Sequence, residues 1–498
     1  MVVVGIDLGT QSLKAVVCNE RLDVLGAHAV SCETEHPRPG WAEQDPRSWD
    51  RALAPAIDGA LRAAGVRAAD VGAVAIAGQL DGCVAVDEHG TALHTALIWQ
   101  DRRAVDHVAR YDAAPLFEIT GQVADASHMA PKIRWLREQG VRAARFHQPV
   151  SYLVERLTGA AALDPAHAST TMLYDLLGGV WSQKLCDAFE LDAAQLPALQ
   201  PATAIAGTLT AAGAELTGLL AGTPVAVGTG DDFATPLGAG ITSPGVIACT
   251  LGTAEVVGAL ADAPVFDIAA MRAASDPWRD LAEPMVETHA YPTGAFFVEN
   301  PGWLAGGAVR WAIETFGFAG EQDLDAQAAA APPGADGVTF VPALSGAMTP
   351  VWRSHARGML YGLTAAHDRK HIARAVLEGI AFASRDVAQR LVALGLPARE
   401  VVLLGGGGRS AVWAQLRADA LGLVHRVASR TDTSAIGAAM IAAVAAGLYS
   451  DLHAAAAQAP APVQAYAPHG PTGALDEAYA RYRRLVAALA PLGDSPWA

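Results

Sequence analysis

The chain has 498 residues, of which 52% are hydrophobic and 17% are charged, and its formal net charge is −16 at pH 7. This length is more than one core fills comfortably, so we expect at least two globular domains, and the composition excludes an intrinsically disordered chain. The acidic balance argues against nucleic acid or an anionic membrane as the main partner, because both select basic surfaces.

The spacing of the cysteines and the length of the apolar segments indicate where in the cell the protein is found. The five cysteines lie far apart and form no C-x-x-C pair (Cys18, Cys32, Cys83, Cys186 and Cys249), which is typical of reduced thiols rather than of a disulfide framework. The N-terminal residues lack a basic segment followed by a long apolar one, and the Ala-rich run 435–447 is shorter than the ~20 residues of a membrane span. We therefore expect a cytoplasmic protein without membrane association.

Strand-like and helix-like segments alternate along the chain. Residues 2–7 predict a strand, and residues 18–33 predict a turn with flanking strands. Residues 45–65 have helical spacing, with Asp45 or Ser48 near the start and Gly65 at the end, and residues 71–79 predict another strand. A long amphipathic helix over 371–395 is followed at once by a strand over 400–408. This alternation predicts α/β domains with ligands at the ends of strands.

A short repeat suggests a duplicated fold. The first strand runs into Asp7-Leu8-Gly9-Thr10, and the strand-like "GVIACT" runs into Leu251-Gly252-Thr253. We predict a hairpin at each site and place a domain boundary near Pro244-Gly245, giving domains over 1–242 and 243–498. The Ala- and Pro-rich stretch after Leu448 predicts a loose connector before a last helix over 475–489.

The stretch "GIDLGTQSLK" has the composition of a phosphate-binding turn. Gly9 lets the backbone approach a ligand because it has no Cβ, and Asp7 can bind a phosphate-associated Mg²⁺ directly or through water. An ordinary hairpin with Asp7 capping the turn is the alternative. The candidate phosphate contacts are the amides and hydroxyls of Thr10, Gln11 and Ser12, together with the charge of Lys14.

Two adjacent carboxylates follow a Gly-rich turn in "GTGDDFATPLGAG". Asp231 and Asp232 stand where a helix is expected to begin, so one of them can be an ordinary N-cap. The functional interpretation is a general base at a strand end, which accepts a proton from a substrate hydroxyl. A helix needs only one capping residue, so the presence of two adjacent acids favours the functional interpretation.

Four glycines, Gly405 to Gly408, separate a buried strand from a helix in "LLGGGGRSAVWAQLRADALG". They make a flat backbone surface that suits a purine ring. A flexible turn and a dinucleotide-binding G-x-G-x-x-G are the alternatives, and the second is weakened because no acidic ribose-binding residue follows at the expected spacing.

Polar residues also follow strand-like runs at "GQLDG" (78–82) and "IWQDRR" (98–103). Asp81 can accept two hydroxyl hydrogen bonds, and Trp99 offers an apolar face to the C–H surface of a sugar. The plainer alternatives are a core tryptophan and a solvated helix start.

In this order, these motifs resemble the FGGY family of carbohydrate kinases over nearly the whole chain, and within it the xylulokinases. "GIDLGTQSLK" resembles the first phosphate motif, and "HPRPGWAEQDPRSW" an early family segment. "SHMAPKIRWLRE" is similar to the first family signature around Lys132 and Trp135, with Met129 where Thr or Ser is usual. "GMLYGLTAAHDRKHIARAVLE", residues 358–378, fits the second signature.

The resemblance implies two actin/hexokinase-like (ribonuclease-H-like) domains with an interdomain cleft, closing to exclude water. The N-terminal domain would bind sugar and the C-terminal domain nucleotide. The implied activity is transfer of the ATP γ-phosphoryl group, with Mg²⁺, to a hydroxyl of a ketopentose, first of all D-xylulose to D-xylulose 5-phosphate. A kinase for ribulose or an erythritol-type polyol, a non-catalytic actin-like ATPase and a sugar-sensing regulator are the alternatives. A homodimer is left open.

The resemblance also implies residue roles. Asp231 would be the catalytic base, and Asp7 would organise Mg²⁺. Gly252 and Thr253, with Thr10, would handle phosphates. The adenine site would be bordered by Gly405, Gly406, Gly407 and Ser410, and sugar contacts would come from Leu80, Asp81, Trp99, Asp231 and Asp232.

Three departures from the xylulokinase pattern concern mainly the sugar pocket. Asp81 stands where His is usual, Asp232 stands where Asn is usual, and the segment 345–350 lacks the usual Glu-Arg pair. Two of these changes place a carboxylate at a sugar-contacting position. The residues expected for ATP are complete, and the expected sugar pocket is altered.

Overall fold

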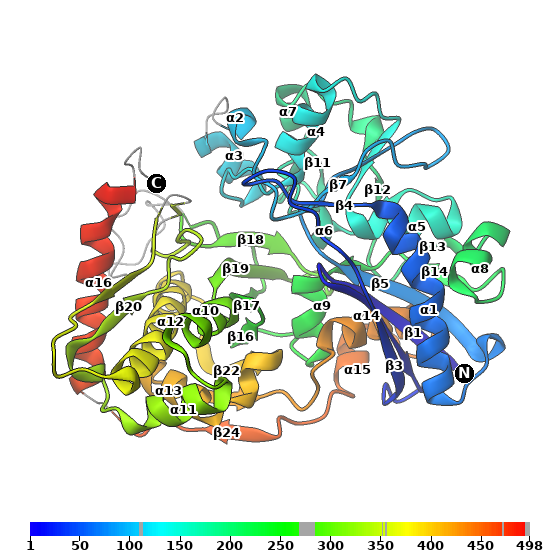
Figure 1. Cartoon of the computed structure of the whole chain (residues 1–498). Coiled ribbons are helices and arrows are strands. Elements are labelled where there is room, and N and C mark those ends of the chain that lie inside the picture. The colour runs from blue at the N-terminus through cyan, green and yellow to red at the C-terminus, as the bar shows by residue number, and fades with distance from the viewer. Residues whose placement is uncertain (109–112, 268–283, 351, 354–355, 471–472, 494–498) are drawn as a thin grey trace. The chain divides into compact units, whose positions relative to one another are not determined.

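The computed structural model describes residues 1–498 except 109–112, 268–283, 351, 354–355, 471–472 and 494–498. The chain forms two compact units (Figure 1). Unit 1 comprises Met1–Thr242, Thr288–Phe297 and Asp432–Pro460, and unit 2 comprises Ser243–Glu287, Val298–Thr431 and Ala461–Ala498. The chain leaves unit 1 after Thr242 and returns to it twice. The division into domains 1–242 and 243–498 stays a prediction.

Unit 1 is built on a mixed sheet with the strand order β13-β14-β5-β1-β2-β3, and β15 also pairs with β5. Strand β1 runs antiparallel to β2 and parallel to β5, so the predicted first strand and its hairpin are confirmed. The strands are β1 (Val2–Leu8), β2 (Ser12–Cys18), β3 (Val24–Ser31), β5 (Val71–Gly78), β13 (Ile205–Thr208), β14 (Pro224–Ala226) and β15 (Thr229–Gly230).

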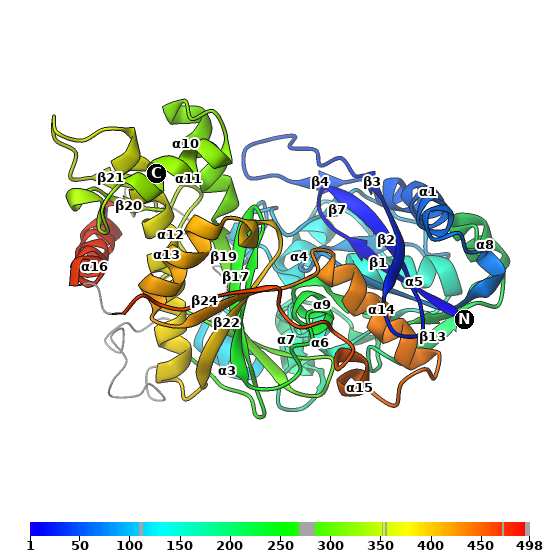
Figure 2. The ribbon, with the colours of Figure 1, turned by 90° about the horizontal axis from the view of Figure 1, so that it is seen from below.

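The two faces of β1 bury different partners, and this follows from the alternation of side chains along a strand. Val4 and Ile6 lie in a buried core with Trp49 and Leu53 of helix α1 (Pro46–Ala64). Gly5 points to the other face, where an added Cβ would lie 2.0 Å from the carbonyl oxygen of Ala435 in α14 (Thr433–Ala445). Figure 2 shows the sheet between α1 and α14. Only glycine allows α14 to approach β1 this closely.

The ends of α1 have the predicted caps. Asp45 is the N-cap, and its side chain accepts a hydrogen bond from the amide of Arg47. Gly65 ends the helix in the left-handed conformation, with φ 64°, which glycine adopts without steric cost. The helix expected over 45–65 is confirmed, and of its two candidate starts Asp45 is the one used.

The remaining elements of unit 1 are short helices and two-stranded ribbons around the sheet. The helices are α2 (Val105–Val108), α3 (Ala113–Thr120), α4 (Met129–Glu138), α5 (Pro149–Thr158), α6 (Pro165–Ala168), α7 (Gln183–Ala188), α8 (Ala211–Thr217), α9 (Asp231–Gly238) and α15 (Leu452–Ala456). The ribbons pair β4 (Glu43–Gln44) with β7 (Ala96–Leu97), β6 (Val84–Val86) with β8 (Arg145–His147), β9 (Ala162–Leu163) with β12 (Ala198–Leu199), and β10 (Tyr174–Asp175) with β11 (Val180–Trp181).

Unit 2 repeats the plan of the first hairpin. Strand β16 runs antiparallel to β17 and parallel to β22, as β1 does to β2 and β5. The expected duplication is therefore confirmed. The unit 2 strands follow the order β19 (Phe296–Leu304, of which Val298–Leu304 belong to unit 2), β17 (Ala254–Ala261), β16 (Gly245–Leu251), β22 (Ala398–Leu404), β23 (Val424–Val427) and β24 (Gln464–Tyr466). All of strand β18 (Glu287–Ala290) except Glu287 belongs to unit 1.

Helix α12 (Arg369–Ala393) confirms the long helix expected before β22, and its N-cap Asp368 accepts a hydrogen bond from the amide of Lys370. The other helices of unit 2 are α10 (Gly306–Phe316), α11 (Glu321–Ala330), α13 (Ala411–Leu421) and α16 (Gly473–Gly493), and a small hairpin pairs β20 (Thr339–Val341) with β21 (Met359–Tyr361).

The stretch after Leu448 is more ordered than the predicted loose connector. It contains α15, whose N-cap Asp451 accepts a hydrogen bond from the amide of Ala454, and β24, which pairs with β23. Alanine-rich sequence forms a helix readily once a cap is present, and Asp451 supplies that cap here. The last helix expected over 475–489 lies inside α16.

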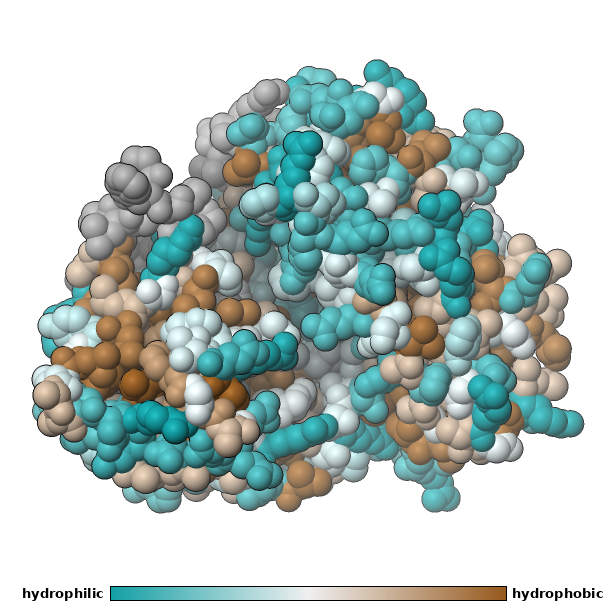
Figure 3. Space-filling view, viewed as in Figure 1, coloured by the Kyte–Doolittle hydropathy of each residue, from teal (hydrophilic) through white to brown (hydrophobic). Residues whose placement is uncertain are grey.

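Surface composition differs between regions of the two units. On the face shown in Figure 3, hydrophilic side chains predominate over the part of unit 1 that carries α4 and α7, whereas hydrophobic side chains gather over part of unit 2 near β20 and α12. Within the described part of the chain, no helix combines the length and the apolar character needed to cross a membrane.

Candidate functional site

Three of the predicted motifs meet in unit 1 because the strands before them are neighbours in one sheet. Leu8 of β1 and Gly230 of β15 both pair with Gly78 of β5. The residues that follow these strand ends are the Gly9-Thr10 turn, the Leu80-Asp81 loop and the acid pair Asp231-Asp232. An added Cβ on Gly230 would lie 2.0 Å from Leu80 Cδ2, so the Leu80 side chain covers this glycine.

Asp231 and Asp232 form the first turn of α9, and neither is its N-cap. Gly230 occupies the N-cap position, so the N-cap interpretation of the acid pair is wrong. Burial, then the charge of Asp232, then that of Asp7 raise the pKa of Asp231 well above its usual value. Burial also raises the pKa of Asp232 to about 6, the charge of Asp81 adds to this, and His289 opposes it. Several carboxylates of unit 1 therefore share one electrostatic environment.

Asp81 and Asp232, the two carboxylates predicted to contact sugar, each interact with a histidine that the sequence interpretation missed. His128 Nδ1 lies 3.1 Å from Asp81 Oδ1, and the His128 ring is buried. His289, also buried, acts on the charge of Asp232. Asp81 has a left-handed backbone with φ 61°, which aspartate adopts more readily than most residues. Asp81 and Asp232 therefore each interact with a buried histidine from another part of the chain.

Asp7 lies at the end of β1, where it meets the N-terminal end of α14. Its carboxylate accepts a hydrogen bond of 2.9 Å from the Ser434 hydroxyl. Burial raises the pKa of Asp7 to about 6, against the effects of the Ser434 hydrogen bond and of Lys14, while Asp432 raises it further. Lys14 Nζ lies 2.7 Å from Asp432 Oδ1, so this predicted phosphate contact is engaged in an ion pair.

The Thr10 turn is tied to two other motifs. Trp99 Nε1 donates to Thr10 Oγ1 at 2.9 Å, and Gln44 Nε2 donates to the Thr10 carbonyl at 2.6 Å. Gln44 Oε1 in turn accepts hydrogen bonds from Trp49 Nε1 and Gln79 Nε2. The buried Gln44 therefore explains the "WAEQ" part of the early segment: it joins the turn to the loop that carries Asp81. Of the other predicted contacts, Gln11 is exposed and Ser12 is partly buried.

A buried carboxylate supports the backbone that leads into the acid pair. Asp164 is the N-cap of α6, and its second oxygen accepts a hydrogen bond of 2.8 Å from the Thr229 hydroxyl. Burial raises its pKa from 3.8 to about 7, although these hydrogen bonds oppose the shift. The Asp164 carboxyl thus changes charge near neutral pH while holding the residue two positions before Asp231.

Replacing Asp164 with Asn is expected to stabilise the protein more at pH 8 than at pH 5. Between pH 3.8 and about 7 the folded chain keeps a proton that the unfolded chain has released, so wild-type stability from this group falls as the pH rises. The side chain in the Asp164→Asn variant is uncharged at every pH, so the variant lacks this pH-dependent loss of stability. We expect the gain in Tm over wild type to be larger by roughly 5 °C at pH 8. An equal difference at both pH values in thermal unfolding would contradict this account of Asp164.

The second group of predicted residues lies in unit 2, at the ends of two parallel strands. Thr250 of β16 pairs with Leu404 of β22, so the turn after β16 and the glycine run after β22 are neighbours. Gly252 and Thr253 are exposed. Their carbonyls accept hydrogen bonds from residues at the start of α10: Gly306 N donates to Gly252 O at 3.2 Å, and Gly307 N to Thr253 O at 3.0 Å.

The glycine run has both tight and open positions. Gly405 has φ 76°, and an added Cβ would lie 2.7 Å from the Leu251 carbonyl oxygen, so the chain here requires glycine. Gly406 is exposed, with nothing within 4 Å of an added Cβ, and Gly407 packs on Leu251. Ser410 is the N-cap of α13 and accepts a hydrogen bond from the Trp413 amide at 3.0 Å. The run presents open backbone on one side and packed backbone on the other.

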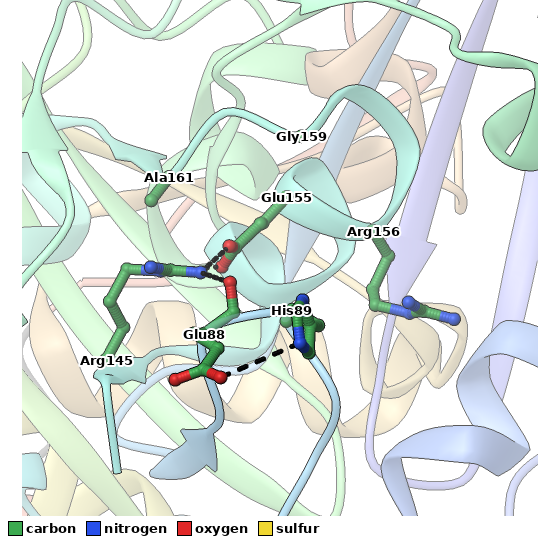
Figure 4. A pocket seen from close by; sticks show the side chains of 8 residues that line it. Glu88, His89, Arg145, Glu155, Arg156, Gly159 and Ala161 are labelled. Atoms are coloured by element: carbon green, nitrogen blue, oxygen red, sulfur yellow. Dashed lines mark hydrogen bonds and ion pairs between the residues drawn. The ribbon is translucent and has the colours of Figure 1, made fainter.

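A separate pocket of about 430 Å³ in unit 1 contains none of the predicted site residues. Figure 4 shows that its charged groups pair with one another: Arg145 binds Glu155, and Glu88 lies near His89. Arg156 at its wall is bound to Asp50. Its lining residues are Glu88, His89, Gly90, Arg145, Glu155, Arg156, Gly159 and Ala161. This internal pairing leaves little unbalanced charge for a ligand.

Among the described residues, no group of three or more His, Cys, Asp or Glu side chains is arranged to hold a metal ion by itself. Asp7 is nevertheless a chemically suitable partner for a hard cation, because its carboxylate oxygens are ligands of the type that Mg²⁺ prefers. A nearby positive charge would also reduce the repulsion between the carboxylates around Asp231, which now raise one another's pKa.

Comparisons with known proteins agree with this arrangement. Residues 2–238 match the N-terminal domain and residues 247–446 the C-terminal domain of the FGGY family of carbohydrate kinases. The chain is 32% identical to the xylulose kinase of Escherichia coli, over 89% of this chain and 90% of that one. It is also 32% identical to the glycerol kinase of Gloeobacter violaceus, over 90% of this chain and 89% of that one.

A solved structure extends the comparison to the fold. The crystal structure of xylulose kinase from Rhodospirillum rubrum superposes with a TM-score of 0.86 at 26% identity, covering 99% of this chain and 100% of that one. Both the sequence relatives and the fold therefore lead to one conclusion. The chain belongs to the FGGY family of carbohydrate kinases and is an ATP-dependent sugar kinase.

Proposed function

We propose that this kinase phosphorylates a ketopentose, first of all D-xylulose, at its terminal hydroxyl to give D-xylulose 5-phosphate. The observation that carries the proposal is the meeting of the acid pair, the Asp81 loop and the Thr10 turn at neighbouring strand ends of unit 1. The xylulose kinases among the relatives support this choice of sugar. The glycerol kinases among the relatives support a polyol as the second candidate substrate. Ribulose, another ketopentose, is a further candidate.

In this proposal Asp231 is the general base. It would accept the proton of the attacking hydroxyl, while Leu80, Asp81, Trp99 and Asp232 hold the sugar. Burial, and after it the charges of Asp232 and Asp7, raise the pKa of Asp231, which makes its carboxylate a stronger base than an exposed aspartate. The water-excluding surroundings that raise this pKa also strengthen the hydrogen bonds that position the sugar.

The nucleotide contacts proposed for unit 1 are centred on Asp7 and Thr10. Asp7 would hold Mg²⁺ directly or through water, and the ion supplies positive charge that offsets the phosphate oxygens. Thr10 Oγ1 accepts from Trp99, so its own hydrogen stays available to a phosphate oxygen. Gln11 and Ser12 would add contacts. Lys14 would reach phosphate only by leaving its ion pair with Asp432.

The nucleotide contacts proposed for unit 2 are mostly backbone contacts. Gly252 and Thr253 would bind phosphate oxygens, and Gly405, Gly406 and Gly407 would border the adenine. The hydroxyl of Ser410 accepts from the Trp413 amide and donates to Asp325. Because both its roles are taken, Ser410 would border the adenine through its backbone rather than through its side chain.

The direct test is to identify the product. The protein is incubated with MgATP and D-xylulose, and the product is analysed by mass spectrometry and by phosphorus NMR. The proposal expects one phosphate ester at the 5-position, formed in equal amount to ADP. A phosphorylated glycerol or tetritol from a parallel incubation, with no ester from D-xylulose, would replace the ketopentose with the polyol alternative.

Exchanging Asp81 for the histidine usual in xylulokinases tests the role of the altered pocket. Asp81→His is expected to change the order of preference among sugars, since it removes the partner of His128 and a buried polar mismatch costs about 1–3 kcal/mol. ADP release is measured over several ketoses and polyols, with the slow sugar-independent ATP hydrolysis as the internal control. An unchanged order of preference would show that Asp81 does not select the sugar.

A further inference from the structure

Lys132 lies in α4 with a fully buried side chain, in an environment that is unusual for a lysine. Its ammonium donates hydrogen bonds to three backbone carbonyls: Asp81 at 2.8 Å, Ile98 at 2.7 Å and Ser127. An ammonium has three N–H groups, so these three carbonyls match its donor capacity. The carbonyls come from three loops that are far apart in the sequence.

Two of these carbonyls belong to, or directly precede, a proposed sugar contact, and the third directly precedes the histidine that contacts Asp81. The first belongs to Asp81 itself, the second immediately precedes Trp99, and the third immediately precedes His128. Asp81 and His128 contact one another, and Trp99 contacts the Thr10 turn. One buried cation therefore joins the loops that carry Asp81, Trp99 and His128.

We propose that Lys132 is a positioning residue for the sugar: its ammonium fixes the three loops that carry Asp81, Trp99 and His128, and it thereby sets the affinity for sugar. The inference rests on the proposed function, because it takes Asp81 and Trp99 as sugar contacts and His128 as the partner that holds Asp81. Lys132 does not itself reach the sugar in this account. Its effect is expected to be larger on the KM for sugar than on the KM for ATP because, within the part of the chain that the structure describes, only Thr10 of the proposed nucleotide contacts is hydrogen-bonded to one of these loops, through Trp99.

The charge of Lys132 gives the inference a pH signature. Burial lowers its pKa to about 8. The neighbouring charges that act on it are Asp81, Asp101 and Cys83, which raise its pKa, and Arg102, which lowers it. Above this pH the neutral amine has two N–H groups for three carbonyls, so one loop loses its bond. Between about pH 8 and 10.5 the folded chain has released this proton and the unfolded chain still holds it. The contribution of Lys132 to stability therefore rises with pH over this interval.

The test compares wild type, Lys132→Met, Lys132→Arg and the exposed control Lys184→Met between pH 7 and 9.5. In wild type, the KM for sugar is expected to rise above pH 8 by more than the KM for ATP does. Lys132→Met is expected to raise the KM for sugar at least ~10-fold at pH 7 and to flatten its alkaline rise. Lys132→Arg keeps its charge throughout this range, so its profile is flat. Lys184→Met follows wild type.

Two results would overturn the inference. One is a folded Lys132→Met variant whose KM for sugar equals that of wild type at pH 7. The other, which holds even if that variant does not fold, is the same alkaline rise in wild type and in Lys132→Arg. Hydrogen exchange gives a readout without any sugar: faster exchange in Lys132→Met, confined to residues 79–82, 98–103 and 123–128, is expected. If no sugar is phosphorylated but these loops loosen, the proposed function fails and the positioning role stands.

Discussion

Asp231→Asn is expected to lower kcat for sugar phosphorylation by at least ~10²-fold and to leave the Kd for MgATP within about twofold of wild type. The variant keeps the size of the side chain at the start of α9 and removes the carboxylate that is proposed to accept the hydroxyl proton. Rapid-quench measurement of ADP formation gives kcat, and equilibrium titration with a fluorescent nucleotide gives the Kd.

The neighbouring Asp232→Asn is the matched control. It places at this position the residue usual in xylulokinases, and it removes the charge that, after burial, does most to raise the pKa of Asp231. We expect it to keep kcat within a fewfold of wild type and to shift the acid limb of the kcat/KM profile to lower pH. Wild-type turnover in Asp231→Asn would remove Asp231 from the role of base.

Arg417→Met is expected to destabilise unit 2 by about 3–5 kcal/mol. The Arg417 guanidinium and the Glu255 carboxylate form an ion pair in which both side chains are almost completely buried. Arg417 also donates to Ser384 Oγ at 2.8 Å and lies 3.0 Å from Cys249 Sγ. Removing the cation leaves a buried carboxylate without its main partner, and the apparent Tm is expected to fall by roughly 10 °C.

The double variant Arg417→Met with Glu255→Leu separates the unpaired charge from the loss of packing. Replacing both partners by apolar groups is often nearly neutral, so the double variant is expected to recover most of the lost Tm. Glu255 lies two residues after Thr253, and nucleotide affinity is expected to fall with the single variant and return with the double. A single variant that melts at the wild-type temperature would contradict the account of this ion pair.

The sequence predicts the strand ends well because they depend on local signals. Hydrophobic patterning and end residues predict the first hairpin, α12, the start of α9 at Asp231, and α1 with its caps Asp45 and Gly65. The duplicated Leu-Gly-Thr turn predicted the common plan of the two sheets, since a turn of that composition needs the same backbone geometry in both places.

The partners of the site residues could not be predicted, because they are distant in the sequence. Lys14 pairs with Asp432, and Asp7 accepts from Ser434, across more than 400 positions. His128 and His289 carry no local pattern that distinguishes a site histidine from a core one. The N-cap interpretation of Asp231 was wrong because a glycine can occupy that position. Such pairings depend on how the sheet brings chain segments together.

The most direct test of the central claim is sugar-stimulated ADP release from MgATP over a panel of pentuloses, hexuloses and four- to six-carbon polyols. The account predicts a clear response to a ketopentose, strongest for D-xylulose, which is abolished in Asp231→Asn. A stronger response to another compound would assign the specificity of the Asp81 and Asp232 pocket to that compound. No response to any member of the panel would contradict the claim that the carboxylates of unit 1 form a sugar kinase site.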